Sequence, residues 1–202
     1  ISQEAQSFSK IGNTAYNVIL GNAKDAFDLD QEPEMMREKY GKGGVGDQML
    51  LARRLAQFGT KFVTVHYGGW DMHSGIKKGL EGKVPPLDKA LAAFVEDIYQ
   101  SGMSEDVLLV VTGEFGRTKL NANAGRDHWP SITPMLLSGG GYDHGRVIGR
   151  ADKSYVPTEN KIGPIDVAAT MFDHFGIDPK MQRVDQAGRP RYLLEGEGKV
   201  IL

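Results

Sequence analysis

Apolar positions at helical spacing predict the helices of this chain. Leucines from residue 50 onward, followed by Phe58, predict a helix that ends at Gly59. A second helix is expected from Pro85 to Gly102, with its apolar residues on one face. A third is predicted over residues 164–175. Residues 1–44 are mostly polar, and we expect them to form a helical lead-in of the same domain.

Three apolar runs rich in β-branched residues predict strands at residues 61–66, 106–112 and 132–137. The run Val107 to Val111 is continuously apolar, as in strands that are buried on both faces of a parallel sheet. Helices alternating with such strands predict an α/β fold, a mostly parallel sheet flanked by helices, in a single domain spanning residues 1–202. Three or four strands are few for such a sheet, so we expect part of the sheet to lie upstream of Ile1 or on another chain.

Composition excludes some classes of partner and of metal site but does not identify a function. The chain has 202 residues, 40% of them hydrophobic and 25% charged, with a formal net charge of -2, so neither nucleic acid nor a membrane surface is an expected partner. No apolar run is long enough to span a bilayer. Cysteine is absent, which excludes thiolate metal sites. The chain does not begin with Met, and we expect it to be part of a longer protein. An oligomeric state is not indicated.

Three polar clusters lie beside the apolar, strand-like runs: residues 69–73 and 113–118 each follow a run, and residues 125–130 stand before the run at 132–137. Loops at the carboxyl ends of parallel strands carry the sites of open α/β sheets, so these clusters predict where the chemistry lies. Asp71 and His73 stand at i and i+2, which in extended backbone share one face. A carboxylate and an imidazole suit Zn, Mn or Fe, and Mg less well. The alternative is a turn Asp that caps the next segment beside a solvated His.

The second cluster holds Glu114 directly after an apolar strand, where a charge needs a partner or a metal. Arg117 is three residues on, and its planar fork suits carboxylate, phosphate or sulfate. Glu114 is therefore a candidate metal ligand or catalytic group, and Arg117 a candidate for catalysis and substrate binding. Alternatively, the two form an ion pair that fixes the loop. Phe115 is expected to pack the loop down.

In the third cluster, His128 stands before Trp129 and Pro130, a rigid setting that suits a ligand or general base. Asp127 is adjacent in sequence, so it is expected to point elsewhere, with a surface pair to Arg126 as the structural alternative. The remaining histidines are weaker candidates: His66 as a core strand residue, His144 in a glycine-rich loop, and His174 as a cation in the last turn of a helix.

Taken together and in this order, the three clusters resemble the DUF1501 family. Further similar stretches are Ala26 to Leu29, Leu50 to Leu55, Ser138 to Gly149 and Asp166 to Asp178, so that the resemblance covers nearly the whole chain. It implies a relationship to the alkaline phosphatase and sulfatase superfamily. That relationship in turn implies an alkaline-phosphatase-like core, one or two divalent metals (Zn, Mn or Ca/Mg), and an exported or periplasmic bacterial protein.

The resemblance also implies roles for individual residues. Asp71, His73 and His128 would be metal ligands, and Glu114 would fall where the superfamily has an Asp. Phe115 stands where a metal-binding His is usual, which puts a full two-metal site in doubt. The nucleophile and a further metal-binding Asp are expected upstream of Ile1.

These considerations leave two main hypotheses. The first is a metal-dependent hydrolase of phosphate or sulfate esters, acting on an anionic small molecule or polysaccharide. The second is a non-catalytic binding or structural protein with a degenerate metal site. A serine hydrolase using His128 and Asp127 ranks below both, because the G-x-S-x-G elbow is absent.

Overall fold

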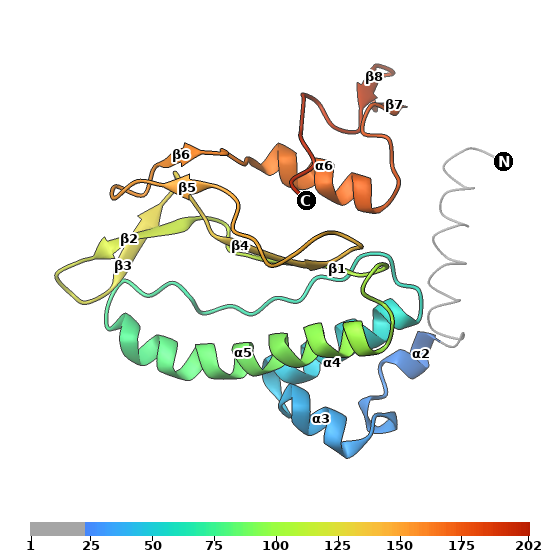
Figure 1. The fold of residues 1–202 in the computed structure, drawn as a ribbon, viewed down its shortest axis with the longest axis vertical. Helices are drawn as coiled ribbons and strands as arrows, with labels where there is room; N and C mark the ends of the chain where they lie inside the picture. The colour runs from blue at the N-terminus through green and yellow to red at the C-terminus, as the bar shows by residue number, and fades with distance from the viewer. Residues whose placement is uncertain (1–22) are drawn as a thin grey trace. The chain divides into compact units, whose positions relative to one another are not determined.

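The computed structural model describes residues 23–202, which divide into two compact units, one ending at Ser101 and one starting at Gly102 (Figure 1). The predicted helical lead-in falls partly on residues 1–22, which lie outside the described residues. Whether the two units belong to one domain, as the sequence suggests, stays a prediction.

The first unit is helical where it is regular. It contains α2 (Ala23–Ala26), the short 3-10 helix η1 (Leu29–Gln31), α3 (Glu34–Tyr40), α4 (Gly44–Gln57) and α5 (Ile76–Gln100). The predicted helix ending at Gly59 is confirmed as α4, and Gly59 has a positive φ of 88° directly after the helix, as glycine helix stops do. Apolar side chains of α3, α4 and α5 form the core of this unit, with Tyr40, Leu50, Phe94 and Ile98 its largest members.

Helix α5 begins nine residues before the predicted start, at Ile76 rather than Pro85. Pro85 and Pro86 lie inside the helix, although a proline lacks the N–H that the helix interior needs and is common only in the first turn. The sequence prediction placed the start at the prolines for that reason. The extra turns carry Gly79 and Lys83, and both contact the polar loop that precedes the helix.

A network of charged side chains is buried among the helices of the first unit. Glu32 accepts a hydrogen bond from Arg53 at 2.6 Å and another from Arg54. On the other side of Arg53, the guanidinium Nε lies 2.9 Å from Oδ2 of Asp97. All four charged side chains are less than a tenth exposed. Two cations thus face two anions, so the buried net charge is zero.

Neutral partners extend this network. The hydroxyl of Tyr40, at the end of α3, donates to Asp97 on α5 at 2.8 Å. Arg54 also donates from Nε to the carbonyl of Ala26 at 2.9 Å. Burial raises the pKa of Tyr40, and its hydrogen bond to the Asp97 carboxylate raises it further. The network therefore joins α2, α3, α4 and α5 through polar contacts.

The predicted strand at residues 61–66 is wrong: this segment has no regular secondary structure, and Phe62 is 65% exposed. Its alternating β-branched residues favour a strand, but a strand needs a hydrogen-bonded partner, and none of the described strands pairs with it. The chain instead continues as an irregular segment along α5 (Figure 1).

The second unit consists of four two-stranded sheets and one helix. The sheets pair β1 (Leu108–Thr112) with β4 (Met135–Gly139), β2 (Gly116–Leu120) with β3 (Arg126–Trp129), β5 (Arg150–Ala151) with β6 (Pro157–Glu159), and β7 (Gln182–Val184) with β8 (Pro190–Tyr192). The helix is α6 (Pro164–His174), which confirms the prediction for residues 164–175.

The predicted mostly parallel sheet is wrong. Every sheet in the described residues has two strands, and every pair is antiparallel. In the largest, Leu108 pairs with Gly139 and Thr112 with Met135. A parallel pair needs a crossover connection, usually a helix, whereas the connection from β1 to β4 contains the β2–β3 hairpin. The residues of β1 are half-buried, with Thr112 exposed, so the apolar run indicated neither burial on both faces nor strand direction.

Helix α6 anchors the C-terminal end of the chain through Asp166 and Thr170. The Asp166 carboxylate accepts the backbone N–H of Gly163 at 2.7 Å, which caps the helix, and that of Lys199 at 2.8 Å. These backbone hydrogen bonds lower the pKa of Asp166. Thr170 accepts the backbone N–H of Ile201 at 3.0 Å. None of the described helices is long and apolar enough to cross a bilayer.

The buried network predicts a large effect of Glu32→Gln. The substitution leaves Arg53 and Arg54 buried beside a neutral amide, so we expect a loss of about 3–5 kcal/mol in the free energy of unfolding. Equilibrium urea unfolding followed by far-ultraviolet circular dichroism measures it. Glu96→Gln is the matched control, because Glu96 pairs with Lys39 at the surface of the same unit, and its removal should barely change stability. Equal effects of the two variants would contradict the network's role.

The same carboxylate predicts acid sensitivity. Burial raises the pKa of Glu32, but the hydrogen bonds and charges of Arg53 and Arg54 outweigh burial and hold that pKa below its ordinary value of 4.5. A folded-state pKa below the unfolded one means that the stabilisation is complete above pH 4.5 and is lost as pH falls through the folded pKa. We therefore expect the stability gap between wild type and Glu32→Gln to narrow below that pH, as urea midpoints would show. A constant gap down to full protonation would contradict this assignment.

Candidate metal centre

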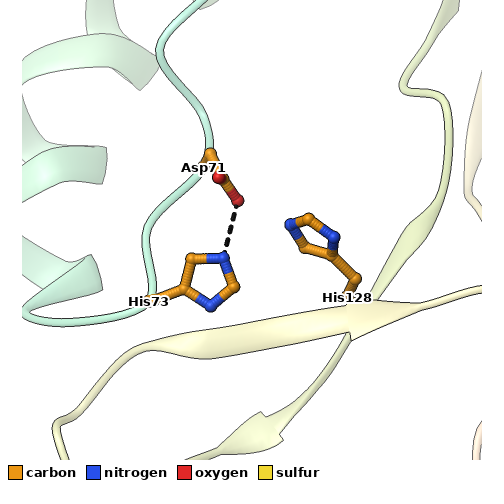
Figure 2. Close-up of side chains that lie close together, drawn as sticks. All are labelled: Asp71, His73 and His128. Carbon is orange, nitrogen blue, oxygen red and sulfur yellow. Dashed lines mark ion pairs between the residues drawn. The ribbon is translucent and has the colours of Figure 1, made fainter.

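Asp71 and His73 lie in the loop before α5 and form a pair (Figure 2). Nε2 of His73 lies 3.0 Å from Oδ1 of Asp71, and both side chains are about half exposed. The predicted i, i+2 convergence of the two side chains is thus present within the first unit. A carboxylate oxygen and an imidazole nitrogen at this separation suit ligation of one small cation.

The loop that carries this pair lies against α5. Met72, between the two polar residues, packs on Gly79 of the helix, where a Cβ atom would come within 2.3 Å of the Met72 sulfur. On the other side of Asp71, the indole N–H of Trp70 donates to the carbonyl of Tyr67 at 2.5 Å. The two sequence neighbours of Asp71, Trp70 and Met72, are therefore both held in place by contacts of their own side chains.

His128 is placed by the β2–β3 hairpin of the second unit. It lies on β3 and pairs with Arg117 on β2. The hairpin turn is closed by Asn121, whose side-chain oxygen accepts the backbone N–H of Asn123 and that of Gly125, each at 3.0 Å. Gly116 begins β2 where only glycine fits, because a Cβ there would come within 1.9 Å of the carbonyl oxygen of Ile132.

One face of this hairpin gathers Phe115, Arg117 and His128. Directly paired residues of antiparallel strands share a face, and so do residues two apart along a strand. The rings of Phe115 and His128 accordingly lie 4.2 Å apart between centroids, tilted by 36°. The Arg117 guanidinium is 5.4 Å from the centre of the Phe115 ring, and its Nη1 donates to the carbonyl of Arg126 at 3.1 Å. Phe115 packs the loop down, as predicted, and does so against the imidazole.

Three of the four predicted metal ligands form a candidate metal centre. In the part of the chain that the structure describes, Asp71, His73 and His128 are the group of carboxylate and imidazole side chains that can hold a metal ion. Each offers one ligand atom, and these atoms lie within 4.8 Å of one another (Figure 2). All three residues are exposed.

The fourth predicted ligand, Glu114, is not a member of this group. It is exposed in the bend between β1 and β2. Its predicted partner Arg117 contacts Phe115 and the Arg126 carbonyl. The roles predicted for Glu114 and Arg117 in catalysis and substrate binding stay predictions.

The other polar candidates serve local structure. Asp127 accepts the side-chain amide of Asn121 at 3.3 Å, and its backbone N–H donates to Thr118. His144 contacts the Gly139 carbonyl at 2.7 Å, and the His174 ring lies beside Phe175. His66 is exposed. None of the four belongs to the metal group found among the described residues.

Comparison with known proteins gives one match. A family model described as "Protein of unknown function (DUF1501)" matches residues 2–202. No curated protein and no solved structure matches the chain.

The contact of Phe115 with His128 predicts an effect that nuclear magnetic resonance can detect. Ring-current shielding from Phe115 should disappear in Phe115→Leu, so the His128 ring protons should move downfield, and we expect a stability loss of about 0.5–1.5 kcal/mol beyond the lost area. His174 is the internal reference, because its ring lies beside Phe175. An unchanged His128 spectrum would show that the two rings are not in contact in solution.

Proposed function

Because the chain belongs to the DUF1501 family, whose function is unknown, we propose that Asp71, His73 and His128 bind one divalent metal ion and that the protein hydrolyses phosphate or sulfate esters. The observation that carries the proposal is the group of one carboxylate and two imidazoles, with ligand atoms within 4.8 Å of one another. The relationship to alkaline phosphatases and sulfatases belongs to the proposal and rests on the order of the polar clusters.

The set of ligand atoms favours some metal ions over others. One carboxylate oxygen and two imidazole nitrogens suit Zn or Mn, whereas Ca and Mg prefer shells made of oxygen. Three protein ligands are also the number that hydrolytic zinc sites use, because they leave a coordination position open. An ion bound there would supply Lewis acidity to polarise the ester. Glu114 would serve as a further ligand or as a group that orients one.

The chain's own contribution to substrate binding is Arg117. It is paired with His128 across the hairpin, so its guanidinium is on the same face as a metal ligand. A planar fork of N–H donors suits two oxygens of a phosphate or sulfate group. Arg117 would thus hold the anionic group of a small-molecule or polysaccharide ester beside the ion. The family resemblance also supports an exported or periplasmic location.

The second candidate function is a non-catalytic binding or structural role. One observation favours it: Phe115 stands where the resemblance leads us to expect a metal-binding His, and its ring packs on His128 at 4.2 Å. A side chain with a packing role at a ligand position is compatible with a site that binds an ion without turnover.

Metal binding tests the first half of the proposal. The chain is incubated with equimolar Zn, Mn, Ca and Mg, desalted, and analysed for bound metal. We expect one ion per chain in wild type and in His174→Ala, a matched histidine outside the group, and a loss of at least about tenfold in affinity in His73→Ala and His128→Ala. Equal metal content in all four proteins would refute the site.

Turnover separates the two candidate functions. The full-length protein, including any sequence that precedes Ile1, is loaded with the metal that it retains and given an aryl phosphate or an aryl sulfate. A hydrolase should lose activity in His73→Ala, and Arg117→Ala should lower kcat/KM by roughly 10–100-fold, because a charge-assisted hydrogen bond is lost. Retention of the metal without hydrolysis of either ester would contradict the hydrolase proposal and favour the non-catalytic alternative.

A further inference from the structure

Lys83 reaches from α5 to the loop that carries Asp71 and His73. Its ammonium group donates to the carbonyl of Gly68 at 2.7 Å. The same group lies 4.8 Å from the centre of the Tyr67 ring and 5.6 Å from that of the Trp70 ring. One cation thus contacts a backbone carbonyl and two aromatic faces within the four residues that precede Asp71.

The loop is shaped to receive this side chain. Tyr67 and Trp70 meet edge to face, with ring centroids 5.5 Å apart, and the Tyr67 hydroxyl donates back to the carbonyl of Lys83 at 3.4 Å. Gly69 has a φ of 84°, and a Cβ atom there would come within 2.7 Å of the Lys83 ammonium nitrogen. A glycine at this position therefore permits both the left-handed backbone and the close approach of Lys83.

The contacts of Lys83 involve residues that are next to the proposed metal ligands in sequence. Trp70 is the residue directly before Asp71, and Met72, directly after it, packs on Gly79 one helical turn before Lys83. The loop that carries Asp71 and His73 lies outside the helices and includes a backbone hydrogen bond from the Met72 N–H to the Trp70 carbonyl at 2.9 Å. A metal site needs its ligands held to within about 0.5 Å, and the contacts of Lys83 hold the residues that directly precede two of them.

We propose that Lys83 is the positioning residue of this metal site: it fixes Tyr67 to Trp70 on α5 and so sets the geometry of Asp71 and His73. This inference rests on the proposed metal binding. Lys83 does not touch the ion, and it acts through the loop.

The experiment measures Zn²⁺ affinity by calorimetry and the environment of Trp70 by ¹⁹F nuclear magnetic resonance of the 5-fluorotryptophan-labelled chain. The variants are Lys83→Met, Lys83→Arg, His73→Ala and the matched control Lys77→Met, whose side chain is on the same helix and is 91% exposed. Circular dichroism melts confirm that each variant is folded.

We expect Lys83→Met to weaken Zn²⁺ binding about tenfold, in the range of residues that orient metal ligands. It should also move the ¹⁹F signal of Trp70 and leave that of Trp129 in place, which a general loss of structure would not do. Lys83→Arg, which keeps the cation and the donor, should bind more tightly than Lys83→Met. Lys77→Met should match wild type.

Two results would overturn the inference, and they are distinguishable. If Lys83→Met binds Zn²⁺ as wild type does while His73→Ala does not, the metal site stands and the positioning role fails. If His73→Ala and wild type bind Zn²⁺ equally, the proposed site itself fails, and the positioning role fails with it.

Discussion

Burial of Glu32 between Arg53 and Arg54 is the constraint on which the first unit depends. Removing charges from water is costly, and the cost is met here only because each guanidinium has a carboxylate or carbonyl within hydrogen-bonding distance. Such a network tolerates little displacement, since a shifted helix would leave a buried charge without its partner. It therefore fixes α4 and α5 against each other more specifically than the apolar contacts of Leu50 and Phe94 could.

That specificity matters because α5 supports the candidate site. The helix presents Gly79 and Lys83 to the loop of residues 67–73, which carries Asp71 and His73. In the second unit, the β2–β3 hairpin positions His128. The hairpin has a tight turn at Asn121 and a glycine at 116, and the Phe115 ring packs on the His128 imidazole. Each unit thus places its ligands through local contacts of its own.

The sequence predicted Asp71 and His73 as candidate ligands from their i, i+2 spacing and His128 from its rigid setting, and the family resemblance grouped the three. It predicted α4 and α6 because leucine spacing, Gly59 and Pro164 indicate helix bounds. The parallel sheet was predicted wrongly, since an apolar run such as Val107 to Val111 suits a strand of either direction, and these residues are only half-buried. Lys83 and the Glu32 network were missed because both depend on contacts between residues far apart in sequence, which local spacing does not reveal.

The central claim is that one carboxylate and two imidazoles bind a single ion, and X-ray absorption of the Zn²⁺-loaded chain tests it most directly. The account predicts a first shell of nitrogen and oxygen atoms at about 2.0–2.1 Å from the zinc, together with the outer-shell scattering of two imidazole rings. His128→Ala should reduce that scattering to one ring. A shell made of oxygen alone, or an unchanged two-ring signal in His128→Ala, would contradict the account.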